Sequence, residues 1–255
     1  MRLFILSLSV ILGIGLCLPV AAKASGGTEH SPKLHWPFEG VFGTFDKAAL
    51  QRGYKVYREV CSSCHSMNKV YFRNLADLGY SDEQIKQAAS EYTFTDGPNE
   101  EGDMFERPGL ASDRFKAPFE NVQQAAYANN GAAPPDMSLL AKARHGGADY
   151  IYAILTGYED APHGHKLMPG QYWNRYMNGN VIAMPPPLAD GQVSYDDGSY
   201  ETLEQYAQDV ASFLTWASDP KMEERKRTGV MAFLFLLVFS GILYAVKKKV
   251  WADQH

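Results

Sequence analysis

Two cysteines and a histidine lie within five consecutive positions, in the stretch VCSSCHSM at residues 60–67. Cys61 and Cys64 are three residues apart, and His65 follows directly. The chain of 255 residues holds 3 cysteines and 7 histidines, so a chance match to C-x-x-C-H has a probability of roughly one in a thousand. The pattern predicts a covalently attached c-type haem, in which both thiols bind the porphyrin and the adjacent imidazole is an axial iron ligand.

Two other kinds of site also use a C-x-x-C pair. A structural zinc site needs four ligands, and the one other cysteine, Cys17, cannot supply a second pair. A thioredoxin-like redox pair is expected beside a βαβ unit, which the flanking sequence lacks. The haem site is therefore the favoured interpretation.

A helical stripe leads into the motif. Steps of four and three residues, which mark one face of a helix, separate Leu50, Tyr54, Tyr57, Cys61 and Cys64. Asp46 is the expected N-cap, and Gly53 is a mild interruption. We expect this face to lie against the haem; an ordinary core stripe ending in two buried cysteines is the alternative.

Charge is spread unevenly along the chain, whose net charge is −5. Residues 25–220 hold 15 Lys and Arg against 26 Asp and Glu, a balance of −11, whereas residues 221–255 carry +4. An acidic body argues against nucleic acid as a ligand. It favours a cationic partner for the body and membrane contact for the basic tail.

The N-terminal segment reads as a secretory signal peptide at residues 1–24. Arg2 precedes an apolar run at residues 3–18, and Ala22-Lys23-Ala24 provides a small-x-small cleavage site. Cys17 would leave with this segment. A lipoprotein cysteine is the alternative, but the residues before Cys17 lack the usual small side chain next to it.

The C-terminal segment reads as a membrane anchor. Residues 229–246 contain no charge, and 18 helical residues span about 27 Å, close to the thickness of the hydrocarbon layer. Basic clusters flank the run at residues 225–227 and 247–249. We therefore predict an exported haem domain at residues 25–220, and an anchor with a short cytoplasmic tail at residues 221–255. A buried core helix is the alternative for the apolar run.

Between the two ends, the periodicity predicts a chain of short helices. We expect helices at residues 81–92, 121–127, 138–144, 149–155 and 203–217. Residues 95–120 are rich in Asp, Glu, Gly and Pro and read as a loop. Residues 192–200 carry Asp197-Gly198 between β-prone residues, the one clear hairpin signal.

Two methionines are candidates for the second axial ligand. Met168 lies in KLMPGQ and Met184 in VIAMPPPL, each followed by proline. A thioether ligand raises the reduction potential of haem iron. Three prolines after Met184 make its loop the more rigid one, whereas Met168 lies among polar residues. The local chemistry favours Met184 as the second axial ligand. The alternative is that its side chain only fills an apolar gap under the loop.

Several long stretches resemble the cytochrome c1 family, the haem subunit of the cytochrome bc1 complex. They are GTFDKAALQRGYKVYREVCSSCHSM, ANNGAAPPDMSLLAKARHGGADYIYAILTGY, NGNVIAMPPPL and YDDGSYETLEQYAQDVASFLTWASDPKMEERKRTG. The resemblance covers nearly everything from Phe38 to the anchor. It implies a mainly α, class I cytochrome c-like domain with insertions, followed by one C-terminal transmembrane helix.

The resemblance also implies roles for individual residues. Cys61 and Cys64 would bind one haem c covalently, and His65 and Met184 would be its axial ligands. Three further family positions carry over: Pro134, whose carbonyl would orient the proximal histidine, Arg144, which would pair with a haem propionate, and Tyr57, at the same haem edge. A turn proline, a surface arginine and a core tyrosine are the ordinary alternatives.

The function implied is one-electron transfer within a respiratory quinol–cytochrome c reductase. The partners would be cytochrome b, the Rieske iron–sulfur subunit and a soluble or tethered cytochrome c, in a dimeric complex. With both iron positions filled, the chain would have no substrate chemistry of its own. The location would be the inner membrane of a bacterium, single-pass, with the haem domain in the periplasm. A carrier or oxidase subunit without a Rieske partner, and an open-haem enzyme such as a peroxidase, are the alternatives.

Overall fold

The helix that leads into the C-x-x-C-H motif begins where the sequence predicts. The computed structural model describes residues 30–254, so the predicted signal peptide at residues 1–24, with Cys17, lies outside the described residues. Helix α1 spans Lys47–Glu59, and the side chain of Asp46 accepts a hydrogen bond of 2.9 Å from the main-chain N–H of Ala48. This capping bond confirms Asp46 as the N-cap.

Most other elements are short helices. After α1 come the 3₁₀ helices η1 (Cys61–Ser63) and η2 (Phe72–Leu78), then α2 (Asp82–Ser90), α3 (Val122–Ala128), α4 (Leu140–Ala143), α5 (Ala148–Thr156), α6 (Leu203–Ser218), α7 (Met222–Val250) and the 3₁₀ helix η3 (Ala252–Gln254). Strand β1 (Thr93–Asp96) pairs with β2 (Phe105–Pro108), and β3 (Tyr172–Trp173) pairs with β4 (Val181–Ile182), both antiparallel. The predicted mainly α fold is confirmed.

Helices α1 and α6 cross in the middle of the body. The rings of Tyr54 and Tyr57 on α1 lie 5.7 and 5.8 Å from the ring of Phe213 on α6. The guanidinium of Arg52 donates two hydrogen bonds, of 2.9 and 3.0 Å, to the carboxylate of Asp209. Because that carboxylate is 1% exposed, this ion pair joins the two helices at a point where water does not reach the carboxylate.

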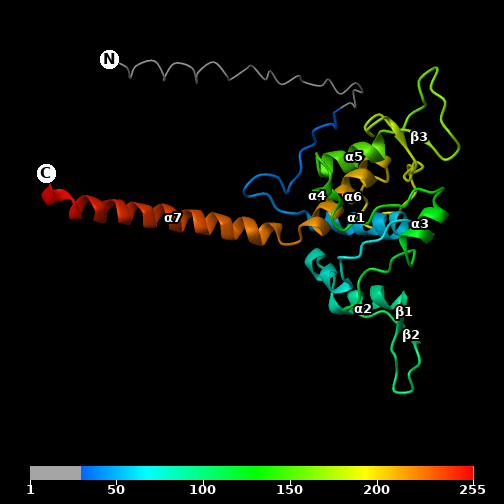
Figure 1. The fold of residues 1–255 in the computed structure, drawn as a ribbon, viewed down its shortest axis with the longest axis horizontal. Helices are drawn as coiled ribbons and strands as arrows, with labels where there is room; N and C mark the ends of the chain where they lie inside the picture. Colours follow the sequence, from blue (N-terminus) through cyan, green and yellow to red (C-terminus); the bar gives the residue numbers. More distant parts are fainter. Residues whose placement is uncertain (1–29, 255) are drawn as a thin grey trace, which may run out of the picture.

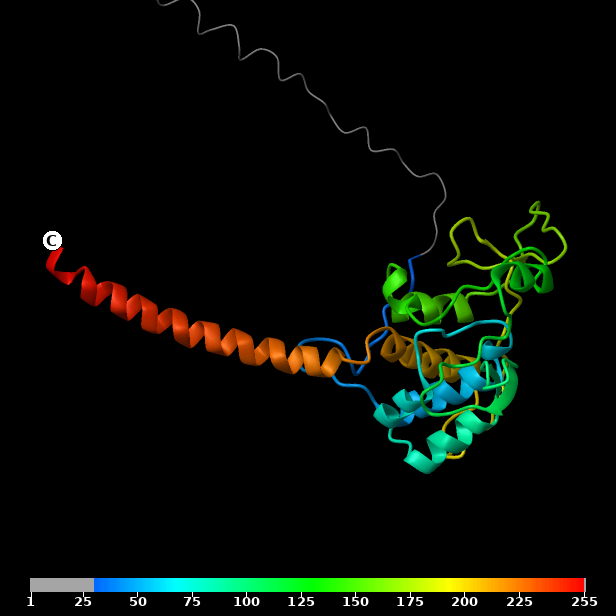
Figure 2. The same ribbon diagram turned by 60° about the horizontal axis from the view of Figure 1, so that its bottom comes forward.

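The remaining elements lie on opposite sides of this central pair. In Figures 1 and 2, α4 and α5 lie on one side of α1 and α6, while α2 lies on the other. The apolar core extends through both sides, since buried residues of η2, α2 and α5 belong to the same cluster as those of α1 and α6. The segment from α1 to η1 therefore runs through the centre of the molecule.

The β-structure differs from the sequence prediction at two places. Residues 192–200, predicted as a hairpin, form turns and loop without strand pairing. Here the hydroxyl of Tyr206 contacts the main-chain groups of Val193, donating to its oxygen and accepting from its N–H at 3.2 Å. Side-chain bonds to α6 thus replace strand pairing. Conversely, the predicted loop at residues 95–120 includes β2, which pairs with β1 to form a projecting hairpin (Figure 1).

Beyond its first turns, helix α7 extends away from the body (Figures 1 and 2). The large apolar side chains from Met231 to Val246 are each 45–66% exposed. By length and composition, α7 can cross a membrane, and its most apolar window has no buried part. An apolar stretch that covers no part of the core does not resemble a buried core helix.

Candidate functional site

Both cysteines of the motif lie at the end of α1 without bonding to each other. Helix η1 turns the chain there, and the main-chain N–H groups of Cys64 and His65 donate to the oxygen of Cys61 at 3.2 and 2.9 Å. Each cysteine is a free thiol. Burial, followed by the neighbouring Cys64, raises the pKa of the Cys61 thiol to about 12, so it stays protonated in the folded chain. Two unpaired thiols one turn apart match the requirement of a c-type haem.

The imidazole of His65 is oriented by one specific hydrogen bond. Its Nδ1 lies 2.8 Å from the main-chain oxygen of Pro135. A carbonyl only accepts, so Nδ1 carries the proton and Nε2 is left with its lone pair free for a metal. Burial lowers the pKa of His65, outweighing the bond to Pro135 and the charge of Asp136, which favours the neutral ring that metal binding needs.

The carbonyl that contacts His65 belongs to Pro135, and the prediction of Pro134 is wrong by one residue. The physical reason is the next residue, Asp136, whose carboxylate sets the register of this loop. Its Oδ2 accepts hydrogen bonds from the hydroxyl of Ser66 at 2.9 Å and from the N–H of Asn68 at 2.8 Å. Since Asp136 is anchored beside residues 66–68, the oxygen just before it faces the ring.

Asp136 is a functional residue that sequence reasoning missed. Besides the two bonds to residues 66–68, its Oδ1 accepts from the N–H of Ser138 at 2.9 Å. The main chain joins the same two segments, since the N–H of Met137 donates to the oxygen of Ser66 at 2.8 Å. An aspartate directly after two prolines was the available signal, because Asp side chains bond nearby N–H groups in turns.

Tyr57 lies directly behind the histidine. It is 2% exposed, and its hydroxyl donates to the main-chain oxygen of His65 at 3.3 Å. Its ring stacks on Phe115 with centroids 6.0 Å apart. Tyr57 therefore supports the main chain of His65, just as Pro135 orients its ring, and both belong to the structure that holds the imidazole in place.

The two methionines have contrasting surroundings. Met168 is 64% exposed, whereas Met184 packs against the cluster that contains Cys61 and Tyr57. Two residues before Met184 the β3–β4 pair ends, and the hydroxyl of Tyr158 donates to the main-chain oxygen of Met184 at 3.0 Å. These contacts favour Met184 over Met168, and its role as the second ligand stays a prediction.

Arg144 lies at the C-terminal end of α4 and is exposed. Its Nη1 donates to the main-chain oxygen of Ala143 at 3.2 Å, and its charge has no carboxylate partner in the described residues. A role in binding a propionate therefore stays a prediction, and the structure leaves the guanidinium available for it.

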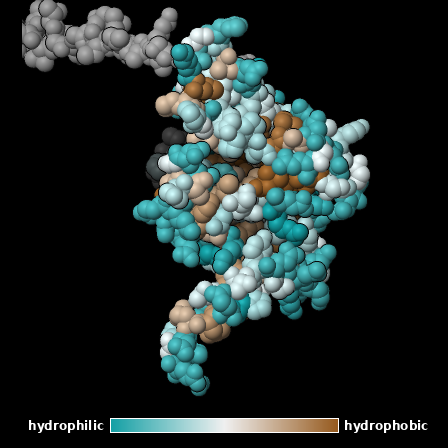
Figure 3. All heavy atoms as spheres, turned by 90° about the vertical axis from the view of Figure 1, so that its right-hand side faces the viewer, coloured by the Kyte–Doolittle hydropathy of each residue, from teal (hydrophilic) through white to brown (hydrophobic). Residues whose placement is uncertain are grey.

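The surface supports an apolar prosthetic group in this region. Figure 3 shows the face at the right of Figure 1, where apolar side chains gather around a hollow across the middle of the body. Among the described residues, no three His, Cys, Asp or Glu side chains come together as a metal cage. Free thiols, an imidazole with one free nitrogen, a half-buried thioether and an apolar hollow fit a haem, which brings its own four nitrogen ligands.

Comparison with known proteins agrees with this geometry. The model of the "Cytochrome C1 family" matches residues 36–254, which covers the motif, the loop of Pro135, Met184 and α7. The chain belongs to the cytochrome c1 family. Membership implies haem binding, and it accounts for the mainly α, cytochrome c-like fold with a single long apolar helix at its C-terminus.

Similar family members come from bacteria and from mitochondria. A cytochrome c1 of Rhodospirillum rubrum is 43% identical over 96% of each chain. A mitochondrial cytochrome c1 heme protein of Solanum tuberosum is 47% identical, over 86% of this chain and 83% of its own. A cytochrome b/c1 of Bradyrhizobium diazoefficiens is 49% identical over 92% of this chain, which spans 37% of that relative's length.

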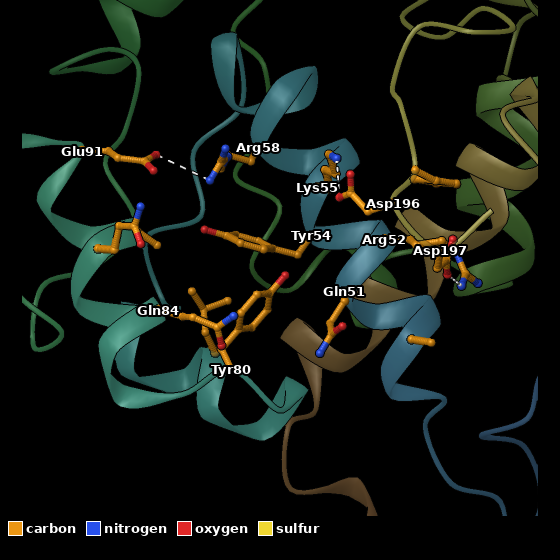
Figure 4. Close-up of a pocket in the computed structure, with 15 residues that line it drawn as sticks. Gln51, Arg52, Tyr54, Lys55, Arg58, Tyr80, Gln84, Glu91, Asp196 and Asp197 are labelled. Atoms are coloured by element: carbon orange, nitrogen blue, oxygen red, sulfur yellow. Dashed lines mark hydrogen bonds and ion pairs between the residues drawn. The ribbon is translucent and has the colours of Figure 1, made fainter. Parts of the chain in front are cut away.

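A pocket of about 560 Å³ lies elsewhere on this cytochrome c1. Figure 4 shows its polar lining, in which each labelled cation faces a carboxylate: Arg52 with Asp197, Lys55 with Asp196 and Arg58 with Glu91. None of the predicted haem ligands lines it. With its cations already paired, this pocket is distinct from the haem site and offers no free charge to a ligand.

Proposed function

We propose that this cytochrome c1 carries single electrons from a Rieske iron–sulfur subunit to a cytochrome c, with one haem bound covalently by Cys61 and Cys64. The observation that carries the proposal is the 2.8 Å contact between Nδ1 of His65 and the oxygen of Pro135. It leaves Nε2 free directly beside two free thiols. This arrangement serves an imidazole that binds a metal. Among the described residues no three His, Cys, Asp or Glu side chains form a cage for zinc, so a haem iron is the metal that fits it.

Met184 is the proposed second ligand. Its half-buried side chain, its carbonyl held by Tyr158 and the three following prolines restrain the loop that would present the sulfur. A haem bound here would supply a one-electron couple of raised potential. With His65 and Met184 both committed, the protein has no open position for a substrate, so it would transfer electrons without catalysing bond chemistry.

Membrane anchoring by α7 completes the proposal. We place the span at residues 229–246, with the haem domain on the periplasmic side of a bacterial inner membrane, after removal of residues 1–24. The basic groups at both ends of the span and the exposed apolar side chains between them support a single crossing. A haem domain tethered in this way stays within reach of membrane-bound partners.

The proposed partners are cytochrome b and the Rieske subunit within a dimeric bc1 complex, and a basic cytochrome c in solution or on a tether. The name of the Bradyrhizobium relative, cytochrome b/c1, supports the first partner. The balance of −11 over residues 25–220 supports the last, because an acidic surface speeds encounter with a cationic protein.

Purification from native membranes tests the proposal. A tag at the C-terminus should recover cytochrome b and a Rieske protein together with haem that denaturing electrophoresis does not remove. Recovery of covalent haem without a Rieske protein would instead support an independent carrier or oxidase subunit. A high-spin spectrum that changes on adding peroxide would support an open-haem enzyme.

A further inference from the structure

A tight turn at residues 39–43 exposes two large apolar side chains close to the start of α7. We propose that this turn is a second membrane contact, in which Val41 and Phe42 lie in the lipid interface beside the span. This inference rests on the proposed anchoring by α7. It adds a surface that would set how the haem domain sits on the bilayer.

The segment around the turn buries the apolar side chains at its base and exposes those at its tip. Val41 is 61% and Phe42 is 83% exposed, whereas Trp36 and Phe38, just before them, are 2% and 9% exposed. The rings of Trp36 and Phe38 stack with centroids 5.4 Å apart. The segment thus buries its base in the protein core and leaves its apolar tip outside, where it is available to an apolar partner.

The turn is built to hold that tip away from the body. A Cβ at Gly43 would lie 1.9 Å from the main-chain oxygen of Glu39, so only glycine fits there. Gly40 has a φ of +70°, in the left-handed region that favours glycine. The N–H of Thr44 donates to the oxygen of Pro37 at 3.1 Å and closes the base. Its tip is therefore presented in a defined shape, with little ordering needed on contact.

Three hydrogen bonds attach the turn to the first turns of α7. The ammonium of Lys226 donates to the main-chain oxygens of Phe38 at 2.6 Å and Gly43 at 3.1 Å. The N–H of Phe45 donates to the carboxylate of Glu223 at 2.7 Å. In Figures 1 and 2, the segment preceding α1 runs beside the start of α7, outside the body.

This attachment places the turn at the edge of the proposed span. Lys226 lies three residues before Gly229, where the uncharged run begins, and three helical residues rise by about 4.5 Å. The apolar tip is therefore continuous with the lipid-facing surface of α7, at the level of the headgroups. Phe and Val at this depth bury their side chains among the upper acyl segments.

The charges around the turn favour lipid over a protein groove as its occupant. Arg227 is exposed on the same turn of α7 as Lys226, and Arg225, also exposed, is paired with Asp219. An exposed cation beside an apolar tip matches anionic phosphate above acyl chains. We therefore commit to a bilayer containing anionic lipid as the partner of this surface.

Spin labels on the full-length haem protein test the inference. With Cys17 replaced by serine, single cysteines are introduced as Phe42→Cys or Val41→Cys at the turn. Leu237→Cys in α7 reports on the span, and Tyr127→Cys on α3, where the native side chain is 91% exposed, reports on open solvent. Each protein is reconstituted into vesicles of phosphatidylcholine and phosphatidylglycerol. Collision of the nitroxide with oxygen, which concentrates in lipid, is compared with collision with a water-soluble nickel chelate.

We expect the labels at positions 42 and 41 to collide more often with oxygen than with the chelate. Their ratio of oxygen to chelate collisions should lie between the ratio at position 237 and the ratio at position 127. If the collision ratio at position 42 equals that at position 127 while the label at position 237 lies in lipid, the turn does not contact the bilayer. That result would overturn the inference and leave the anchor intact. A label at 42 shielded from both reagents would also overturn it, because protein and not lipid would cover the turn. A label at 237 open to the chelate would instead contradict the proposed anchoring itself.

Discussion

Gly53 of α1 passes so close to Asp209 of α6 that a Cβ on the glycine would lie 2.1 Å from the main-chain oxygen of the aspartate. The helices can approach this closely only because Gly53 has no side chain. The sequence suggests a mild interruption of α1 at this position. In the folded chain the glycine is the contact point of the central helix pair, and α1 continues through it unbroken.

Gly53→Ala should lower the free energy of unfolding of the haem domain by about 1–3 kcal/mol or more, since this is the usual cost of inserting a methyl group into a packed contact. Helix propensity alone predicts the opposite sign, since alanine favours a helix by about 1 kcal/mol over glycine. Chemical unfolding followed by circular dichroism measures the difference. Gly229→Ala in α7 is the matched control, because no atom lies within 4 Å of a Cβ there. A neutral Gly53→Ala would mean that α1 and α6 pack less closely.

Asp136→Asn should weaken the loop that orients His65 by about 1–2 kcal/mol, since the carboxylate accepts bonds from Ser66, Asn68 and Ser138. Burial raises the pKa of Asp136, but these bonds outweigh it and hold the pKa below its ordinary 3.8. A depressed pKa stabilises the fold above the ordinary value, and that contribution is lost as pH falls through the folded-state pKa.

The stability difference between wild type and Asp136→Asn should therefore be full at neutral pH and shrink below about pH 3.8. Unfolding titrations at several pH values give this profile. Asp77→Asn, at an exposed position, is the control and should show no such trend. A difference independent of pH would show that the charge of Asp136 is not what anchors the loop.

Met184→Leu should keep covalent haem, because Cys61 and Cys64 are unchanged, while losing the thioether ligand. The reduction potential should fall by on the order of 0.1 V or more, within the roughly 0.8 V range over which axial ligands act. The charge-transfer band from sulfur to iron should disappear. Met168→Leu is the control, since that side chain is 64% exposed. If the band disappeared in Met168→Leu and stayed in Met184→Leu, Met168 would be the axial ligand.

Tyr158→Phe should loosen the loop of Met184 without removing the ligand. The change deletes the 3.0 Å hydrogen bond to the oxygen of Met184, worth about 1 kcal/mol. We expect a weaker sulfur-to-iron band and a smaller fall in potential than in Met184→Leu. Tyr200→Phe, at a tyrosine that is 79% exposed, should change neither. If stability fell while band and potential stayed normal, Tyr158 would be structural only.

Neutralising the tip of the β1–β2 hairpin should slow electron transfer to a basic cytochrome c at low salt. Glu100, Glu101 and Asp103 are exposed there, whereas Glu106 is bonded to Thr95 and is left unchanged. At an ionic strength of about 0.1 M the screening length is roughly 10 Å, so wild type and variant should converge as salt rises. Equal rates at all salt concentrations would exclude the hairpin from docking.

Asp77→Asn serves as the charge control in the same kinetic experiment, because Asp77 lies near Lys221 at the start of α7. It should leave the low-salt rate close to that of wild type. Glu159 and Asp160 are a further candidate docking segment from their charge in the sequence, but this segment contributes less free charge because Glu159 is paired with Arg175.

The extent of the helices was predictable because their signals are local. Asp46 caps α1, Ser81 caps α2 and Thr202 caps α6, each by accepting a hydrogen bond from a main-chain N–H. The apolar residues of α1 and α6 repeat with the period of a helix, which places them on a buried face. Positions of this kind follow from the nearest neighbours in the chain.

Two of the departures from prediction depend on partners outside the local segment. Pro135 contacts His65 across 70 residues because Asp136 anchors its loop to Ser66. The loop before α6 forms no hairpin because Tyr206 takes the main-chain groups of Val193. Local β-propensity and turn signals carry no information about such competitors.

The sequence by itself determined the chemistry of this protein: two thiols and an imidazole adjacent in the chain, candidate thioethers before prolines, and an uncharged run long enough to cross a membrane. Covalent neighbours must meet in any fold. Only the tertiary structure decided which carbonyl orients the histidine, how closely α1 meets α6, and that Val41 and Phe42 lie beside the start of α7. These depend on bonds between segments far apart in the chain, whose geometry exists only once the core has packed.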